Sequence, residues 1–452
     1  MVIFEKTRVK YCKVFINFER KFAIMMTKAT GNNSSGRIKL EDLLDKTHGL
    51  YQLANKLNWD YLAEHFGQFY SEDNGRSGIP IRIMTGLHYF KYLENESDET
   101  VVEKFRENPY WQYFCGLEYF VHEIPCHPTT LVKWRKRLGI KGVEKLLTET
   151  LNAAKRLSFL TEALLKRVNV DTTVQEKAIT FPTDAKLCHK MREHLVKEAR
   201  LRKVGLRQTY VRVSKRALTQ QSRYVHAQQM KRARKETKKV KNYLGRVVRD
   251  IERKIKYPDI QLNEKLLMAN RLLIQEKDDK NKLYSLHAPE VECIAKGKIH
   301  KKYEFGCKVS IVTTAKEPWV VGIKAHHGNP YDGHTLKASL KQAKKLSGIK
   351  PQQAFVDKGY RGKEHHPRDV EVFVTGRKGL SGTLKRFLKA RSGIEPIIGH
   401  LKEDNKLCRN HLLGKIGDHI NALLSACAFN LRKIIRYLLV NDDMKMAGQL
   451  WA

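Results

Sequence analysis

Three carboxylates stand out from the 48 Asp and Glu residues of this 452-residue sequence because of their local surroundings. Asp171 and Asp357 each end an apolar run that predicts a strand, and Glu395 lies in a segment with helical periodicity. Carboxylate oxygens are hard donors of the kind that Mg²⁺ and Mn²⁺ prefer. Two such ions can activate an attacking oxygen and stabilise a leaving oxygen during displacement at phosphorus.

Basic residues accompany Glu395 on its predicted helix, which spans about 382–407. Arg391, Glu395 and Lys402 fall at i, i+4 and i+11, nearly on one face. An adjacent apolar stripe is formed by Ile394, Ile397, Ile398 and Leu401. The helix can therefore bury its aliphatic side and turn Glu395 toward the strand ends, with Arg391 and Lys402 able to orient a phosphate. Each acid taken alone is more simply a turn former or a surface residue, but together they favour a catalytic metal site.

The elements that must position these acids follow from the apolar patterns along the chain. Strands are expected at 167–173, 178–181, 303–313, 319–325, 354–357 and 370–375, and helices at about 332–345 and 382–407. The order is a strand pair, a basic insertion, two strands, a helix, a strand, another strand and a long helix. This order predicts an α/β fold.

Positive charge dominates the composition, with 86 Lys and Arg and a net charge of +38. Residues 186–256 hold 24 of these basic residues and only 5 acidic ones, which is half of the net charge. Helical spacing of the apolar residues there predicts long helices with one basic face. Such charge indicates a polyanion as the partner of the protein. DNA is the first candidate, and an anionic membrane surface is the second. A solvated helical arm without a partner would have a similar sequence. The candidate phosphate contacts are Lys231, Arg232, Arg234, Lys235, Lys238 and Lys239.

The N-terminal third, about 38–157, has a helical pattern throughout. After two prolines, Thr129 or Thr130 can cap a short helix that Gly139 would end. This helix carries Lys133, Arg135, Lys136 and Arg137. A short basic helix after a turn is what helix-turn-helix proteins place in the major groove of DNA. A helical bundle with a basic rim fits the same residues equally well.

Several protein classes are disfavoured. Eight Cys without a C-x-x-C pair argue against a disulfide scaffold, and a reducing cytoplasm is the simplest compartment. The longest apolar stretch, 420–440, carries three basic residues and predicts an amphipathic core helix, so no membrane partner is expected. Residues 1–37 are expected to be a basic extension with a flexible linker, and 439–452 a tail.

Longer motifs surround these residues. They are RIMTGLHYFKYLENESDE in the N-terminal third, VNVDTTVQEKAITF around Asp171, HGNPYDGHTL and AFVDKGYRG up to and beyond Asp357, and RSGIEPIIGHLKED around Glu395. Together they resemble the DDE transposases of bacterial insertion sequences, in the insertion-sequence-five group. In that group a Tyr, Arg, Glu and Lys recur at gaps of two, three and six residues. Arg391, Glu395 and Lys402 fit these gaps, whereas Leu388 stands in place of the Tyr.

The resemblance implies an RNase H-like catalytic core with a mixed sheet, in which Asp171, Asp357 and Glu395 hold Mg²⁺ or Mn²⁺. It implies that a homo-oligomer binds terminal inverted repeats of double-stranded DNA, cuts at the element ends and transfers strands into target DNA. The expected compartment is the cytoplasm of a prokaryote, at the nucleoid.

The expected domains are a helical DNA-binding domain at 38–160 and a catalytic domain at 161–438. A basic helical insertion at 190–290 would interrupt the catalytic domain between its second and third strands. Two alternatives remain open: a domesticated DNA-binding protein without catalysis, and an RNase H-like nuclease that cuts without rejoining.

Overall fold

The sheet at the centre of the molecule has the order β2-β3-β1-β5-β6, and β4 also pairs with β3. This computed structural model describes residues 38–70, 78–276, 278–295 and 302–449, with side chains to residue 440. The expected N-terminal extension at 1–37 lies outside these residues. The strands are β1 (Arg167–Glu176), β2 (Glu292–Ala295), β3 (Tyr303–Thr314), β4 (Val320–His326), β5 (Gln353–Val356) and β6 (Glu371–Val374).

Strand directions decide the fold class. β1, β3 and β4 form an antiparallel meander, whereas β5 and β6 run parallel to β1. Three antiparallel strands continued by two parallel ones make up the RNase H-like sheet. The predicted α/β fold with a mixed sheet is therefore confirmed. Helix α14 (Asp332–Ser347) forms as predicted, whereas the single helix predicted over 382–407 is divided into α15 (Gly382–Ala390) and α16 (Ile394–Glu403).

Two strand predictions were wrong. Asp171 lies in the middle of β1, opposite Ile311 of β3, because the pairing with β3 extends the strand to Glu176. No strand forms at 178–181. The chain leaves the sheet there, because the Ala178 backbone N–H donates to the carbonyl of Asn410 and not to a neighbouring strand. The inserted helices consequently follow the first strand of the sheet, rather than the second.

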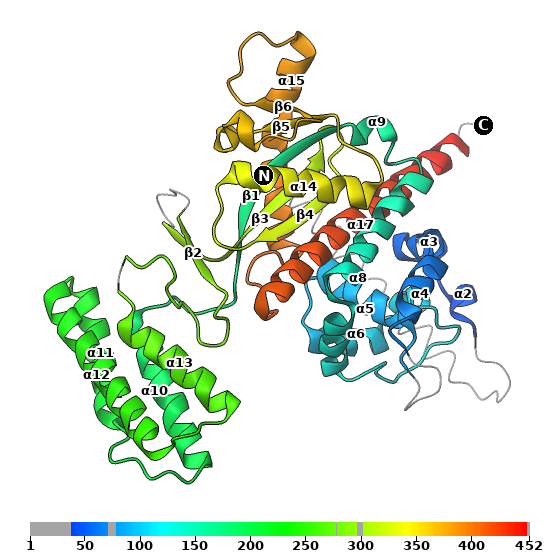
Figure 1. Cartoon of the computed structure of the whole chain (residues 1–452). Helices are drawn as coiled ribbons and strands as arrows, with labels where there is room; N and C mark the ends of the chain where they lie inside the picture. Colours follow the sequence, from blue (N-terminus) through cyan, green and yellow to red (C-terminus); the bar gives the residue numbers. More distant parts are fainter. Residues whose placement is uncertain (1–37, 71–77, 277, 296–301, 450–452) are drawn as a thin grey trace.

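Four helices inserted after β1 form a bundle that we call the inserted module. They are α10 (Asp184–Leu201), α11 (Val211–His226), α12 (Met230–Lys254) and α13 (Ile260–Ile274). Figure 1 shows this module, in green, standing away from the sheet. It has a hydrophobic core of its own, to which α12 contributes Val240, Leu244, Val247, Val248 and Ile251 at helical spacing.

The N-terminal helices are α2 (Leu40–Leu43), α3 (Gly49–Lys56), α4 (Trp59–Gly67), α5 (Ile81–Leu93), α6 (Asp98–Glu107), α7 (Pro109–Phe114) and α8 (Pro128–Arg156). The long α17 (Gly414–Gln449) packs between α8, α5 and β4, with Leu424 and Leu431 fully buried. One continuous hydrophobic core joins these helices to the sheet. In the described part of the chain, no helix combines the length and apolar character needed to cross a bilayer.

Candidate active site

Asp171 lies on β1 with most of its side chain covered, since 17% of it is exposed. Its Oδ1 accepts a hydrogen bond from the Thr172 backbone N–H at 2.7 Å. Its Oδ2 accepts one from Nη1 of Arg391 at 3.2 Å. A carboxylate fixed on a central strand is held by the sheet itself, so its position does not depend on a loop.

The helix predicted over 382–407 is broken in two, and Arg391 stands at the break. α15 ends at Ala390, a 3₁₀ turn covers Arg391–Gly393, and α16 begins at Ile394. Pro396 explains this break, because it has no N–H to donate and fits only in the first turn of a helix. Arg391 nevertheless keeps its predicted relation to Glu395, with Nη2 at 3.7 Å from Oε1.

Asp357 follows β5 directly, as the sequence predicted, and caps the 3₁₀ turn Lys358–Tyr360. Its Oδ1 accepts a hydrogen bond from the Gly359 backbone N–H at 2.9 Å. A Cβ on Gly359 would lie 3.0 Å from Oδ1 of Asp357 and 3.0 Å from Oδ2 of Asp332. The two carboxylates thus converge on one backbone position, where a larger residue would have to displace them.

Asp332, the first residue of α14, is an acid of this site that the sequence reasoning missed. Its Oδ1 accepts hydrogen bonds from Thr172 Oγ1 and from Lys308 Nζ, both at 2.9 Å. The available signal was its place beside Gly333 at a helix start, within a motif already noted. A first-turn carboxylate is favourable beside a helix dipole, so this position did not by itself indicate chemistry.

Tyr360 lies close enough to three of the acids for their charges to affect its hydroxyl. Its side chain is fully buried. Burial first, and then the charges of Asp171, Asp332 and Asp357, hold the pKa of its hydroxyl well above the ordinary value. The charges of all three carboxylates affect one buried hydroxyl, in agreement with the contact of Asp332 with Thr172 and its approach with Asp357 to Gly359.

The other positions of the predicted signature helix have different surroundings. Lys402 is half-buried and lies two turns beyond Glu395 on α16, a rise of about 10 Å. Leu388, at the position of the family's Tyr, packs against the apolar cluster of Phe355, Phe373 and Phe387. Glu395 is the most exposed of the acids, at 66%.

The donor set fits hard divalent cations. Asp171, Asp332, Asp357 and Glu395 supply carboxylate oxygens only, which suits Mg²⁺ or Mn²⁺ and not a thiophilic metal. Arg391 and Lys308 offset part of the negative charge of these four acids.

The basic residues predicted on α8 divide into two groups. Lys133, Lys136 and Arg137 are exposed. Arg135 is buried and donates to both oxygens of Asp98, at 2.7 and 2.6 Å, so its prediction as a DNA contact was wrong. Arg135 is buried because its ion pair with Asp98 holds α6 against α8.

The residues that begin and end α8 can be compared with the predicted cap at Thr129 or Thr130 and the predicted end at Gly139. His127 caps α8 instead of Thr129 or Thr130, because the helix already begins at Pro128. The predicted end at Gly139 is confirmed as a break in the helix, with φ at 58°. Residues 115–127 separate α7 from α8 without a helix, so these two do not form a short-turn helix-turn-helix.

The six basic residues predicted on α12 are all exposed; they are Lys231, Arg232, Arg234, Lys235, Lys238 and Lys239. Lys239 pairs with Glu236 at 2.6 Å, and the Arg232 guanidinium lies 5.9 Å from the centre of the Tyr224 ring. These contacts leave most of the positive face of α12 turned to solvent.

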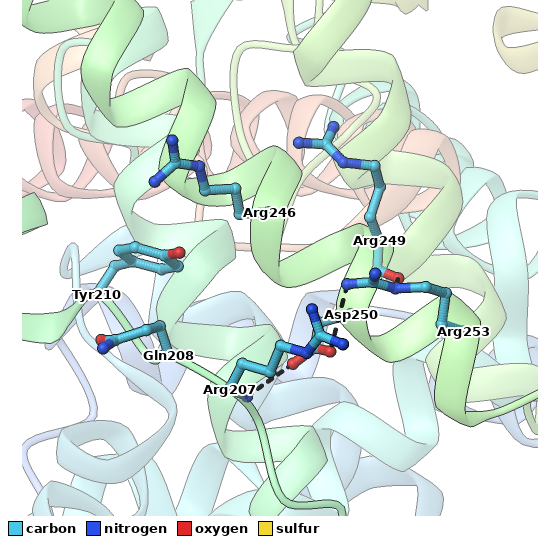
Figure 2. A pocket seen from close by; sticks show the side chains of 7 residues that line it. All are labelled: Arg207, Gln208, Tyr210, Arg246, Arg249, Asp250 and Arg253. Carbon is cyan, nitrogen blue, oxygen red and sulfur yellow. Dashed lines mark hydrogen bonds and ion pairs between the residues drawn. The ribbon is translucent and has the colours of Figure 1, made fainter.

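A second basic feature of the inserted module is a pocket lined by Arg207, Gln208, Tyr210, Arg246, Arg249, Asp250 and Arg253. Figure 2 shows Arg207 and Arg253 beside Asp250, which accepts a hydrogen bond from the Arg207 backbone N–H at 2.8 Å, while the guanidinium groups of Arg246 and Arg249 point away from it. Tyr210 stacks on Tyr243 and has a left-handed backbone, with φ at 54°. Four arginines and one aspartate line the pocket, which leaves an excess of positive charge there.

Comparisons with known proteins bear on this arrangement. Residues 38–137 match a family model described as a transposase domain (DUF772), and residues 285–371 match one described as a transposase DDE domain. The chain belongs to the DDE transposases of insertion sequences. The DDE match contains Asp332 and Asp357, whereas Asp171 and Glu395 lie outside it.

A curated relative adds a partial match. A Rhizobium meliloti protein, described as uncharacterized protein ORF8 in the nfe locus, is 44% identical over 201 residues. The match covers 44% of this chain and 97% of that protein. No solved structure matches. Transposases of the DDE family act on DNA and generally use divalent metal ions, which agrees with a site built from carboxylates.

Proposed function

We propose that this DDE transposase binds the terminal inverted repeats of an insertion sequence, cuts the DNA at the element ends and joins the cut strands to target DNA. The observation that supports the proposal is that three acids far apart in the sequence lie in one region beside the central strand β1. Arg391 contacts both Asp171 and Glu395, and Asp171 and Asp357 each lie two residues beyond the paired residues Asn169 and Phe355 of the parallel strands β1 and β5. Such a group of hard donors suits phosphoryl transfer.

Asp171, Asp357 and Glu395 would hold Mg²⁺ or Mn²⁺, with Asp332 within reach of the same site. When bound, these ions activate water or a DNA 3′-hydroxyl and stabilise the leaving oxygen. Arg391 is placed to orient the scissile phosphate, because its guanidinium already lies among the carboxylates. Lys402 would contact a phosphate farther along the same strand.

Two surfaces would hold the DNA. The exposed residues Lys133, Lys136 and Arg137 would face the inverted repeat, while the inserted module would bind backbone phosphates through α12. Phosphate contacts require positive charge within reach and do not require one fixed geometry, which suits long flexible side chains. Two ends must be held together for transposition, so we expect a homo-oligomer in the active complex, acting on nucleoid DNA.

The test uses purified protein, labelled element-end DNA and Mg²⁺ or Mn²⁺. Asp171→Ala, Asp357→Ala and Glu395→Ala should each abolish cleavage while binding of the DNA, measured by gel shift, persists. Asp369→Ala is the matched control, because this acid is 62% exposed and pairs only with surface Lys350 in the described contacts. Full cleavage by any one of the three variants would overturn the assignment of that acid.

The alternatives separate in the same assay. A domesticated DNA-binding protein would bind the ends without cutting them under any metal condition. A nuclease would cut but would not join a pre-cleaved 3′-hydroxyl end to a target plasmid. Terminal inverted repeats flanking the gene, with short direct duplications outside them, would support the transposase.

A further inference from the structure

A second group of metal-binding residue types lies away from the carboxylate site. Cys307 of β3, His327 just after β4 and Asp418 near the start of α17 place one donor atom each within 4.8 Å of one another. Cys307 and Asp418 are buried, and 13% of the His327 side chain is exposed. These residues are far apart in the sequence and follow no ligand spacing, so only the fold brings them together.

The two oxygens of Asp418 have different surroundings. Oδ1 accepts hydrogen bonds from Lys177 Nζ and from Asn410 Nδ2, both at 2.7 Å. Oδ2 faces Nε2 of His327 at 3.7 Å. This distance exceeds a hydrogen bond. It is close to the separation of two ligands on one tetrahedral ion, about 3.3–3.8 Å for metal–ligand bonds of about 2.0–2.3 Å.

The imidazole of His327 is buried in a way that is typical of a metal ligand. Both of its ring nitrogens are buried, and neither has a hydrogen-bond partner among the described residues. Burying unsatisfied polar atoms is costly. Nδ1 faces Oε1 of Glu292 at 3.6 Å. Histidines that bind a metal through one nitrogen usually turn the other toward a carboxylate or carbonyl, which is the arrangement seen here.

The charge balance points the same way. The ammonium group of Lys177 lies 2.7 Å from Oδ1 of Asp418 and 2.8 Å from Oε1 of Glu290, while Glu292 faces His327 nearby. Three carboxylates against one cation leave two negative charges, and side-chain exposure ranges only from 3% to 22%. Uncompensated charge is expensive in such surroundings. A single divalent ion would neutralise it.

We propose that Cys307, His327 and Asp418 bind one thiophilic divalent ion of the zinc class, with a water molecule completing the coordination. The sulfur, nitrogen and oxygen donors distinguish this site from the oxygen-only active site. Gln175 Nε2 lies 3.6 Å from the Cys307 sulfur and would donate to a thiolate. The exposed Gly328 and Asn329 beside His327 offer a route from solvent.

The site would brace the root of the inserted module. Lys177 stands where the chain leaves β1 toward the module, and Glu290 stands where it returns before β2. An ion held by β3, the end of β4 and α17 would therefore fix the point from which the module projects. The role is structural and independent of the carboxylate chemistry.

The test measures metal in the purified full-length protein after dialysis. About one zinc ion per chain is expected by elemental analysis. Exchange for Co²⁺ should produce the near-ultraviolet absorption of a cobalt thiolate. Cys307→Ser should abolish that absorption, while Cys427→Ser, which changes another fully buried cysteine, should keep it. Glu395→Ala should also keep it, which separates this site from the proposed catalytic ions.

Two results would overturn the proposal: a wild-type protein that binds Co²⁺ without thiolate absorption, and a Cys307→Ser variant with the wild-type spectrum. If Cys307→Ser does not fold, His327→Gln serves in its place, since it should lower zinc content to below about a fifth of the wild-type value. Chelation of the wild-type ion should speed proteolysis in 178–183 and 284–291 by several-fold, and an unchanged rate would exclude the bracing role.

Discussion

Nη1 of Arg391 donates a hydrogen bond to Oδ2 of Asp171 over 3.2 Å, although the two residues are 220 positions apart in the chain. The same guanidinium lies 3.7 Å from Glu395. One fixed cation thus stands between two of the proposed metal ligands. Because like charges repel strongly at such distances in a partly buried site, Arg391 and a divalent ion compete for these carboxylates.

Replacing Arg391 should therefore separate metal binding from catalysis. We expect Arg391→Gln to bind Mn²⁺ about tenfold more tightly, a change of ~1.4 kcal/mol, and yet to cut DNA more slowly because the phosphate loses its partner. Titration calorimetry with Mn²⁺ and the cleavage assay give the two readouts. Arg386→Gln, an exposed arginine on α15, is the control. Weaker Mn²⁺ binding by Arg391→Gln would contradict the competition.

Asp332 should contribute to both stability and chemistry. Asp332→Asn leaves the ammonium of Lys308, which is 10% exposed, without its charge partner, and should cost about 1–3 kcal/mol of unfolding free energy. Cleavage should fall about 10- to 100-fold if Asp332 supports the metal site. The double variant Asp332→Asn with Lys308→Met should recover stability without recovering cleavage. Recovery of both would assign Asp332 a purely structural role.

Neighbouring basic residues on α8 should behave in opposite ways. Arg135→Leu removes one partner of a buried ion pair and should lower the unfolding free energy by about 3–5 kcal/mol. Lys136→Ala, on the exposed face, should change stability by less than about 0.5 kcal/mol and should weaken DNA binding. Urea unfolding and gel shift provide the comparison. A stable Arg135→Leu protein with impaired DNA binding would restore Arg135 as a DNA contact.

Stability of the N-terminal helices should fall in acid. Burial, and then the charge of Arg135, lower the pKa of His88 to about 3, so the folded state excludes a proton that the unfolded chain takes up near pH 6.5. Although burial opposes it, hydrogen bonds from Arg135 lower the pKa of Asp98. That contribution is present above the unfolded value of about 3.9 and is lost as the pH falls further.

The measurement is the thermal midpoint between pH 7 and pH 3. The midpoint should begin to fall below about pH 6.5 in the wild type, because protonation of His88 favours the unfolded chain. His88→Gln should reduce the fall above about pH 4 and leave the part due to His326 and His419, whose pKa values burial lowers to about 4. Parallel curves for the two proteins would show that His88 does not control the acid response.

The arginine pocket of the inserted module should add to phosphate binding. Changing Arg246, Arg249 and Arg253 together to Gln should weaken binding to every DNA sequence alike. The slope of log affinity against log salt should decrease by about 0.9 for each phosphate that the variant no longer neutralises. Lys190→Gln, an exposed residue of α10, is the control. An unchanged salt slope would exclude the pocket as a phosphate-binding surface.

Much of the fold follows from local patterns in the sequence. Apolar runs predicted the strands of Asp171 and Asp357, and helical spacing predicted α12 and α17. Asp357 was placed correctly at the end of a strand, because the short apolar run before it was enough to predict that strand. The depth of Asp171 within β1 was not predictable, because it depends on how many residues of the partner strand β3 pair with it.

The remaining differences have tertiary causes. The sequence around Arg135 is typical of a surface cation, and its burial depends on an ion pair with Asp98, 37 positions earlier. The break before α16 did have a local signal in Pro396, but a continuous apolar stripe concealed it. Cys307, His327 and Asp418 had no sequence signal, because three separate elements bring them together.

The pairing of Glu176 with Gly306 is where β1 and β3 meet at the root of the inserted module. A Cβ on Gly306 would collide with the Gln175 carbonyl, so the two backbones can be this close only with glycine there. The module therefore leaves the sheet after Glu176 and rejoins it at Glu292, which pairs with the other side of the same Gly306. Sequences of different length and charge could therefore be exchanged between Glu176 and Glu292 while the register that positions Asp171 stays unchanged.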